Sequence, residues 1–414
     1  MLRTPDKHLI TALDIGTSKV VAMVAEVTED NKLHIIGVSS HPSKGLKKGV
    51  IVNIEATVSA IQKAVSDAEH MADCKIRSVT VGVAGSHIKS FNSHGVVAIR
   101  NQEVSDNDVD RVIEAAKAVA LSADQRILHI LPQEFIIDHQ EGIHEPVGMS
   151  GVRLEAKVHL VTGSVSAVQN IVKCVQACGL QVEDLVLEQL ASSYAVLSED
   201  EKELGVCLVD IGGGTTDIAV FTEGAIRHTS VVPIAGDQVT NDVAHALRTP
   251  TQYAEVIKLD HGCALARLAD VDESVQVKGV GDRPGRRLSL QTLAGVIESR
   301  YEELLTLVHQ DLKRSGYLDS LAGGIVLTGG SSQVPGLVEL AEEIFRIPVR
   351  LGVPQRFTGM NEIVGSPIHS TGVGLLHYCH QQKEAGAPIE VESAVNDQEY
   401  SVVEKMKRWF SRYF

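Results

Sequence analysis

The sequence predicts an α/β protein that folds as two similar lobes. A segment made of an apolar strand, an aspartate, a glycine turn and a second strand occurs twice, at residues 13–21 (LDIGTSKVV) and at residues 209–220 (VDIGGGTTDIAV). A chain of 414 residues is also too long for a single hydrophobic core. Because the two segments lie in different halves of the chain, they predict two half-domains of related fold that face each other.

Composition limits the class of protein and its partners. Hydrophobic residues make up 44% of the chain and charged residues 22%, which is ordinary for a globular protein in water. The formal net charge of −15 argues against nucleic acid as the main partner, because binding phosphates needs a basic face. The six cysteines and 17 histidines show no spacing typical of a disulfide framework or of a transition-metal site.

The first part of the chain is predicted to be a sheet with helices laid against it. Alternating and β-branched residues predict three strands between residues 8 and 41, joined by hairpin turns. Apolar residues at helical spacing predict a helix over 54–71 that Asn53 caps. Residues 77–85 return as a strand. This order of elements is typical of a layered α/β domain.

Residues 86–160 predict a small inserted α+β subdomain. A helix near 106–121 lies between strand-like pieces at 94–100, 127–137 and 152–162. The segment contains no glycine-rich loop and no cluster of catalytic residue types. It could be a contact surface for a partner or a passive elaboration of the fold, and the sequence leaves both interpretations open.

The remainder predicts the second lobe and the return to the first. A strand turns into a helix at Gly236 and Asp237, where free backbone amides would form an anion site. A long helix is predicted over 290–314, and 322–337 reads as a buried strand, a glycine turn and a helix. Within a helix that opens near Pro250, Glu255 and Lys258 share one face. That pair could be an exposed ion pair or could contact the hydroxyls of a ribose.

The glycine turns have the composition of phosphate-binding loops. Glycine has no Cβ, so backbone N–H groups can approach a ligand closely. Asp14 and Asp210 end their strands beside these turns, where each carboxylate could hold a hydrated Mg²⁺, and Lys19 adds a cation. One such turn alone could be a plain hairpin, but three in this order favour a phosphate site.

Two Asp-Ile-Gly hairpins followed by strand, TGGSS and helix resemble the actin-like ATPase superfamily, which includes actin, the DnaK-type chaperones and the sugar kinases. The resemblance implies an actin-like two-lobed fold of duplicated RNase H-like ATPase domains that binds ATP and Mg²⁺. It implies a first phosphate loop formed by Asp14, Gly16, Thr17, Ser18 and Lys19. It implies a second formed by Asp210, Gly212, Gly213, Gly214, Thr215, Thr216 and Asp217. The adenosine would then meet Gly329, Gly330, Ser331 and Ser332.

The superfamily's inter-lobe helix usually starts with a Glu-Pro pair. Glu188 matches the glutamate, which by the resemblance would orient the attacking water, but Gln189 departs from the pattern by replacing the proline. No strongly placed general base stands out. The resemblance therefore implies a nucleotide-binding cytoskeletal protein with at most slow ATP hydrolysis rather than an enzyme.

The end of the chain predicts a tethered amphipathic helix. Residues 381–399 are polar and acidic, as in a flexible linker, and 400–414 follow as the helix. On a helical wheel its apolar residues fall within an arc of roughly 140°. They are Val402, Val403, Met406, Trp409, Phe410, Tyr413 and Phe414. The basic residues on the other side are Lys405, Lys407, Arg408 and Arg412. This pattern predicts a helix lying in an anionic membrane interface, although it could instead dock on its own domain or on a partner.

With the inserted segment and this terminal helix, the chain is similar over essentially its whole length to the FtsA family of bacterial cell division proteins. The resemblance implies a peripheral protein at the division septum, on the cytoplasmic face of the inner membrane, that polymerises and anchors the FtsZ filaments of the Z ring. It would capture the C-terminal tail of FtsZ and help recruit later division proteins. Arg300, within 229–302, could meet that acidic tail or simply be solvated. The alternatives are a pilus-assembly actin-like scaffold and a soluble kinase of the same superfamily.

The resemblance also implies subdomain boundaries. The first lobe would comprise 1–85, 161–197 and 360–380, with 86–160 inserted. The second lobe would comprise a core of 198–228 and 303–359 and a smaller subdomain of 229–302.

Overall fold

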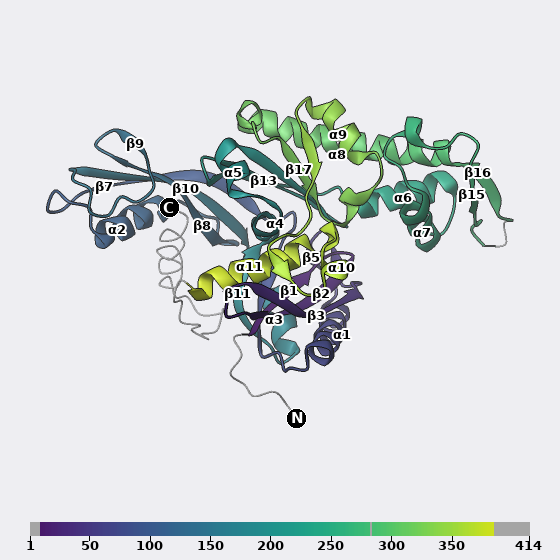
Figure 1. Ribbon diagram of the computed structural model, residues 1–414, viewed down its shortest axis with the longest axis horizontal. Helices are drawn as coiled ribbons and strands as arrows, with labels where there is room; N and C mark the ends of the chain where they lie inside the picture. Colours follow the sequence, from purple (N-terminus) through teal and green to yellow (C-terminus); the bar gives the residue numbers. More distant parts are fainter. Residues whose placement is uncertain (1–8, 282–283, 385–414) are drawn as a thin grey trace.

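The computed structural model describes residues 9–281 and 284–384 of the chain. Its elements form two lobes and a third, smaller body that projects from one side (Figure 1). The predicted terminal helix and residues 385–399 of the predicted linker lie outside the described residues. Residues 381–384, which the sequence assigned to the linker, are the last residues of a helix.

The first lobe is built on a six-stranded sheet in the order β11-β6-β1-β2-β3-β19. β1 and β2 form the predicted hairpin, with Asp14 opposite Val21 near the glycine turn. The Asn53 side chain accepts a hydrogen bond from the amide of Ala56 and so caps α1, as predicted. The strands are β1 (Leu9–Ile15), β2 (Lys19–Val27), β3 (Leu33–Pro42), β6 (Ser78–Val83), β11 (Gln181–Leu187) and β19 (Phe357–Thr358), with a separate pair β4 (Leu46–Lys47) and β5 (Val50–Ile51). The helices are α1 (Ile54–Ala72), α3 (Val165–Ala177) and α10 (Asn361–Val364).

The second lobe repeats this plan on a five-stranded sheet in the order β14-β13-β12-β17-β18. β12 and β13 form the second predicted hairpin, which places Asp210 opposite Asp217, and β17 runs parallel to β12. The strands are β12 (Val206–Ile211), β13 (Thr216–Thr222), β14 (Ala225–Val232), β17 (Ile325–Thr328) and β18 (Val349–Leu351), with a separate hairpin β15 (Ser274–Val277) and β16 (Arg286–Ser289). The helices are α5 (Glu199–Leu204), α6 (Gly236–Leu247), α7 (Thr251–His261), α8 (Leu290–Ser315) and α9 (Leu337–Phe345).

The inserted segment forms its own sheet, β7-β10-β8-β9, with one helix and a separate cluster of buried apolar residues. The elements are β7 (Lys89–Ala98), α2 (Asp106–Lys117), β8 (Gln125–Ile137), β9 (Gln140–Ile143) and β10 (Arg153–Ser164). α2 ends at Lys117, earlier than predicted, because Val119 packs against the subdomain core in a non-helical conformation. The short strand β9 was not predicted, since its residues, QEGI, carry little apolar pattern.

The inserted subdomain docks on β14, the edge strand of the second lobe, through side-chain hydrogen bonds. Ser90 donates to the carbonyl of Thr229 at 2.7 Å, and Gln133 donates to the carbonyl of Ile226 at 2.9 Å. The ring of His159 is buried and lies 2.9 Å from the Thr229 hydroxyl, and burial lowers the pKa of His159 to about 3. The subdomain is therefore inserted in the chain of the first lobe and hydrogen-bonded to the second, while the backbone amide of Leu187 in the first sheet donates to Nε2 of His129 in β8 at 3.0 Å.

Two helices cross each other where the two lobes meet. α4 (Glu188–Val196) leads from the first sheet towards the second, and α11 (Ser370–Glu384) packs against both α4 and the first sheet (Figure 1). At the crossing, a Cβ on Gly374 would lie 1.8 Å from the carbonyl oxygen of Ala191. Only glycine allows this backbone contact, so the crossing point is fixed by one residue.

Candidate functional site

The first two predicted loops touch each other directly. A Cβ on Gly213 would lie 1.8 Å from Oγ of Ser18, and a Cβ on Gly214 would lie 2.4 Å from Oγ1 of Thr17. The hydroxyls of the first loop therefore rest on the backbone of the second. Any larger residue at these two glycines would displace the side chains of Ser18 or Thr17.

The third loop closes onto the second. The hydroxyl of Ser331 donates to the carbonyl of Gly212 at 2.7 Å. A Cβ on Gly329 would lie 2.3 Å from Oδ1 of Asp210, and Gly329 also has a positive φ of 86°. Ser332 is buried and donates to the carbonyl of Gly329. All three loops predicted from the sequence therefore meet at one place.

The N-terminus of α6 lies at the same place but differs from the prediction. The amides of Gly236 and Asp237 donate to the carbonyls of Gly212 and Gly213, at 3.2 Å and 2.8 Å. These two amides are therefore not free for an anion, as the sequence interpretation expected, because the second loop packs against the helix end. The Cβ position of Gly236 would lie 2.2 Å from the hydroxyl of Ser331, so this helix end also touches the third loop.

Glu255 and Lys258 form an ion pair with an N–O distance of 2.8 Å. The alternative of an exposed pair is wrong for the lysine, whose side chain is only 7% exposed. Its Nζ also donates to the hydroxyl of Thr240 at 2.9 Å and to the carbonyl of Gly236 at 3.3 Å. Lys258 thus links α7 to the start of α6, beside the three loops.

The charged groups of the site are three buried carboxyls, the half-buried Glu188 and one lysine. Burial, aided by Asp210, raises the pKa of Asp217 to about 7. Burial also raises the pKa of Asp14 to about 6, against the opposing effect of Lys19. The pKa of Glu188 lies well above its usual value because of burial and the nearby Asp14. Burial and mutual repulsion therefore oppose the simultaneous ionisation of these carboxyls beside one lysine.

These residues fit a hydrated Mg²⁺ better than a directly chelated one. Among residues 9–281 and 284–384, no three acidic, histidine or cysteine side chains converge closely enough to hold a metal ion between them. Mg²⁺ keeps several of its waters in such sites and reaches carboxylates through them. Oδ1 of Asp217 is buried without a hydrogen-bond partner, so the site contains an acceptor that a water molecule could satisfy.

Several residues around the site were not predicted from the sequence. Ser192 and Thr371 both donate hydrogen bonds to Asp210. Lys19 donates to the carbonyl of Ile368, in the 3₁₀ helix η4 (Pro367–His369) before α11. Gln189, which follows Glu188, is fully buried, and neither polar atom of its side chain has a partner. These contacts join segments far apart in the chain, and no local motif marks them.

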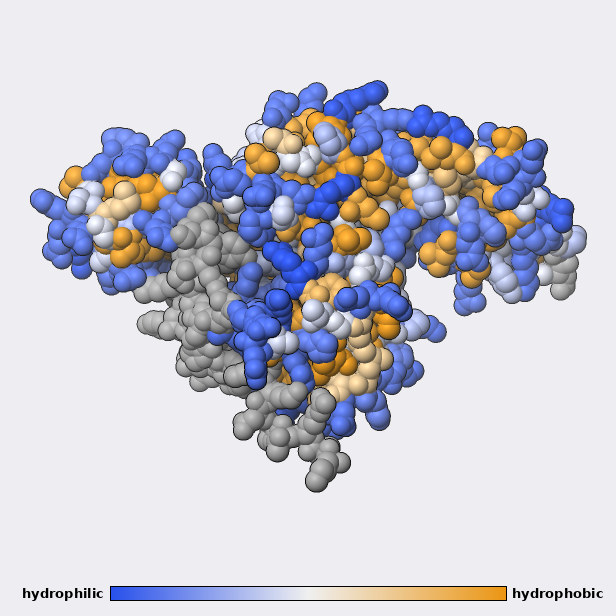
Figure 2. Space-filling model, viewed as in Figure 1, coloured by the Kyte–Doolittle hydropathy of each residue, from blue (hydrophilic) through white to orange (hydrophobic). Residues whose placement is uncertain are grey.

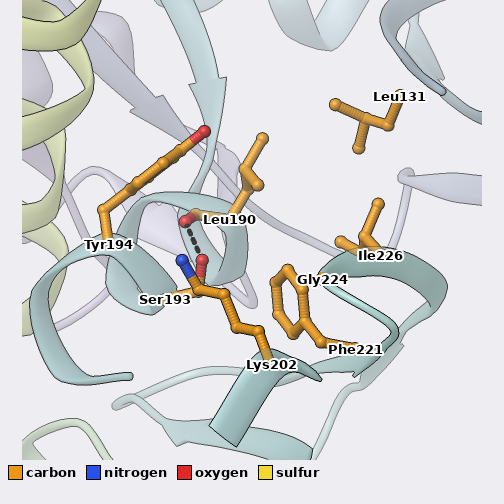
Figure 3. A pocket seen from close by; sticks show the side chains of 8 residues that line it. All are labelled: Leu131, Leu190, Ser193, Tyr194, Lys202, Phe221, Gly224 and Ile226. Carbon is orange, nitrogen blue, oxygen red and sulfur yellow. Dashed lines mark hydrogen bonds between the residues drawn. The ribbon is translucent and has the colours of Figure 1, made fainter. Parts of the chain in front are cut away.

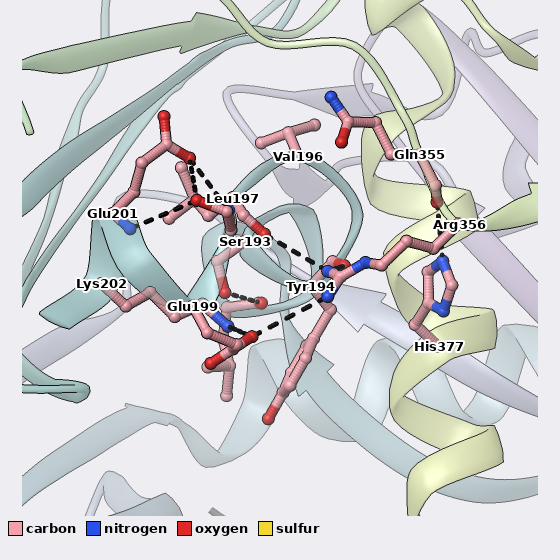
Figure 4. Close-up of polar contacts among 12 residues, drawn as sticks. Ser193, Tyr194, Val196, Leu197, Glu199, Glu201, Lys202, Gln355, Arg356 and His377 are labelled. Atoms are coloured by element: carbon pink, nitrogen blue, oxygen red, sulfur yellow. Dashed lines mark hydrogen bonds and ion pairs between the residues drawn. The ribbon is translucent and has the colours of Figure 1, made fainter.

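A network of polar contacts ties the chain's return from the second lobe to the end of α4 (Figure 4). Arg356 donates to the carbonyls of Tyr194 and Leu197. The backbone amide of Gln355 donates to the backbone carbonyl of Ala195 at 2.9 Å. The two segments that connect the lobes are therefore bonded to each other.

A small cavity lies beside α4 (Figure 3). Its volume of about 10 Å³ has room for roughly one water molecule, so it is not a nucleotide pocket. It is lined by Leu131, Leu190, Ser193, Tyr194, Lys202, Phe221, Gly224 and Ile226.

Arg300, the predicted partner contact, already has acidic neighbours. Its guanidinium forms ion pairs with Asp242 and Glu303, and these contacts raise its pKa. An acidic peptide would have to compete with both carboxylates. In the same lobe, α7 exposes Tyr253, Val256 and Leu259, and Figure 2 shows hydrophobic side chains at the surface in this region.

The predicted membrane-facing residues, 402–414, lie outside the described part of the chain. Within residues 9–281 and 284–384, no helix is both long and apolar enough to cross a bilayer.

Solved structures share the fold of this chain. The type IV pilus PilM–PilN complex aligns with a TM-score of 0.65 at 15% identity, covering 90% of this chain and 98% of that one. MreB5 of Spiroplasma citri bound to AMPPNP aligns with a TM-score of 0.55 at 15% identity, covering 92% and 100%. These alignments confirm the predicted actin-like fold.

Sequence comparisons give the family. A family model described as "Cell division protein FtsA" matches residues 207–374, and one described as "SHS2 domain inserted in FTSA" matches residues 85–162. The cell division protein FtsA of Pseudomonas aeruginosa is 61% identical over 409 residues, covering 98% of each chain. That of Neisseria meningitidis is 49% identical, covering 99% of each chain. The chain therefore belongs to the FtsA family of cell division proteins.

Proposed function

We propose that this protein binds Mg-ATP at the three loops, forms filaments on the cytoplasmic face of the inner membrane, and anchors FtsZ filaments there during septum formation. The observation that carries the proposal is the direct contact of Ser18 and Thr17 with the backbone of Gly213 and Gly214. A nucleotide held between these loops would bridge both lobes. The proposal is supported by the actin-like fold and by the nucleotide bound in one structural neighbour.

The residues of the site suit a triphosphate. The glycine turns offer backbone amides, and Thr17, Ser18 and Lys19 offer hydroxyls and a cation. Asp14 and Asp210 would accept hydrogen bonds from the waters of a hydrated Mg²⁺, which supplies positive charge that neutralises the phosphates. Gly236, Asp237 and the third loop would face the nucleoside, near the Glu255–Lys258 pair.

Slow turnover would fit the surroundings of Glu188. Burial and the nearby Asp14 raise the pKa of this carboxyl, which disfavours the ionised form that a general base needs. We therefore expect Glu188 to orient a water rather than to activate it. On this view, bound ATP mainly holds the two lobes in the shape that polymerises.

Membrane attachment is assigned to residues 400–414, and FtsZ capture to the smaller part of the second lobe, 229–302. One amphipathic helix is a modest anchor, whereas a filament presents many copies and binds at high effective concentration. Attachment and self-assembly are therefore coupled. The inserted subdomain, for which we propose the boundaries 86–160, would offer a surface to later division proteins.

Two binding measurements test this function. A fluorescent ATP analogue should bind the wild type in the presence of Mg²⁺, and the Asp14→Ala and Asp210→Ala variants should lose that binding. Unaltered affinity in both variants would refute the site. Cosedimentation should bring the protein down with FtsZ filaments but not with FtsZ that lacks its last residues, and equal recovery with both would refute the proposed contact.

A further inference from the structure

Two hydroxyl groups, one from each of the crossing helices, meet a single oxygen of Asp210. Ser192 of α4 donates to Oδ2 of Asp210 at 2.6 Å, and Thr371 of α11 donates to the same oxygen at 3.4 Å. The two hydroxyl oxygens are 3.1 Å apart. All three side chains are buried. One oxygen of the carboxylate therefore accepts hydrogen bonds from both of the crossing helices.

The other oxygen of Asp210 is placed at the junction of the loops. Oδ1 occupies the space beside Gly329, where a Cβ would lie only 2.3 Å away. With Oδ2 held by two hydroxyls, the carboxylate cannot rotate without breaking those bonds. Oδ1 is thereby fixed where the second and third loops meet.

We infer that Ser192 and Thr371 are positioning residues for the metal-bound nucleotide, because they orient Asp210 so that Oδ1 can accept a hydrogen bond from a water of a hydrated Mg²⁺. This inference rests on the proposed function. Since the two hydroxyls belong to α4 and α11, a change in the angle between these helices moves the carboxylate. Metal binding and the angle between the lobes are therefore linked through this residue.

Neighbouring serines on the same helices show what an ordinary buried hydroxyl does here. Ser193, next to Ser192, donates to the carbonyl of Leu190 within its own helix at 2.7 Å (Figure 3). Ser370, next to Thr371, contacts the hydroxyl of Thr328 at 2.7 Å. Within the described part of the chain, neither hydroxyl is hydrogen-bonded to a carboxylate. Ser193→Ala is therefore a matched control for Ser192→Ala.

The test compares the affinity for ATP in excess Mg²⁺ with the affinity for ATP in EDTA, by titration calorimetry on the full-length protein. The double variant Ser192→Ala, Thr371→Val should bind Mg-ATP about tenfold or more weakly, which is the effect of roughly one hydrogen bond to a charged group. Its affinity for ATP in EDTA should equal that of the wild type. Ser193→Ala should change neither value, and Ser192→Thr should retain most of the Mg²⁺ effect.

A thermodynamic cycle gives a second, independent readout. If the hydroxyls act through Asp210, adding Ser192→Ala to Asp210→Asn should cause no further loss of Mg-ATP affinity. The single variants replace the double variant if circular dichroism shows that the latter is unfolded. Thr371→Val keeps the shape of the side chain, so it is the milder change.

The outcomes separate this inference from the proposed function. Equal losses of affinity with and without Mg²⁺ would show a purely structural role and overturn the inference, as would unchanged affinity in both conditions. A wild type that binds ATP in neither condition would instead refute the proposed function, and the inference with it.

Discussion

Arg350 of β18 and Glu201 of α5 form a two-pronged ion pair, with Nε 2.7 Å from Oε1 and Nη2 2.8 Å from Oε2. The same Nη2 donates to the carbonyl of Val196 at the end of α4. Glu201 also accepts a hydrogen bond from the amide of Ser198 and so caps α5. Arg350 of β18 is thus bonded to both α4 and α5, and so links these two helices to the second sheet.

Replacing this arginine should destabilise the protein measurably. We expect Arg350→Ala to lower the free energy of unfolding by about 1–2 kcal/mol, a value reduced by the partial exposure of both side chains. Arg350→Lys should recover only part of this, because an ammonium cannot make the two-pronged contact. Urea unfolding followed by circular dichroism measures the effect. The control is Arg314→Ala, which removes the ion pair of a largely exposed arginine with Asp311 and should have a smaller effect; equal effects would contradict the prediction.

The contact between the first two loops can be tested with one methyl group. Gly213→Ala places a Cβ where the Ser18 hydroxyl now lies, so the Ser18 side chain must leave its position, and we expect the affinity for Mg-ATP to fall at least about tenfold. Gly295→Ala in α8 is the control, because a Cβ there meets nothing within 4 Å. It should retain nucleotide affinity and stabilise the helix by about 0.5–1 kcal/mol. Wild-type affinity in Gly213→Ala would count against loop contact in the bound state.

The stability of the nucleotide-free protein should depend on Asp217 near neutral pH. The folded protein keeps a proton on this group up to about pH 7, whereas the unfolded chain loses it near about pH 4. The stabilisation is therefore complete below about pH 4 and is lost as the pH rises through about 7. We expect Asp217→Asn to flatten the fall in unfolding free energy between about pH 5 and about pH 8.

This prediction concerns the difference between the wild type and Asp217→Asn in how the unfolding free energy changes with pH, because other groups shape each curve. Asp14 acts in the same direction as Asp217, since its pKa is raised to about 6. His369 acts in the opposite direction, because burial lowers its pKa to about 4. Both groups are present in wild type and variant, so parallel curves for the two proteins would show that Asp217 is not the group that titrates.

Membrane binding should reside in the last fifteen residues or so of the chain. The full-length protein should pellet with vesicles that contain phosphatidylglycerol, and a version cut after Glu399 should stay in the supernatant. Trp409→Glu should act nearly like the cut, because it places a charge on the apolar face, whereas Trp409→Phe should still pellet. Equal sedimentation of the full-length and cut proteins would contradict the proposal that residues 400–414 bind the membrane.

Elements whose signals lie in neighbouring residues could be predicted from the sequence alone. The hairpin around Gly16, the cap at Asn53 and the glycine turn after Thr328 each depend on neighbouring residues, and the structure has all three. The helix α8 also agrees with its prediction to within one residue, since its apolar period is long and regular.

Contacts between distant segments could not be predicted in this way. Ser192 and Thr371 look like ordinary helix residues, and only the crossing of α4 and α11 brings both to Asp210. The burial of Lys258 was missed for the same reason, since its partners Thr240 and Gly236 belong to another helix. In each case the decisive information is a tertiary distance, which spacing along the chain does not contain.

The docking of the inserted subdomain on β14 affects how the molecule carries mechanical force. Its two ends emerge from the first lobe, yet Ser90 and Gln133 donate hydrogen bonds to a strand of the second. The backbone amide of Leu187 in the first sheet also donates to the ring of His129 in β8, so the subdomain is bonded to both lobes. A force on this outlying body would therefore load its contacts with both lobes at once.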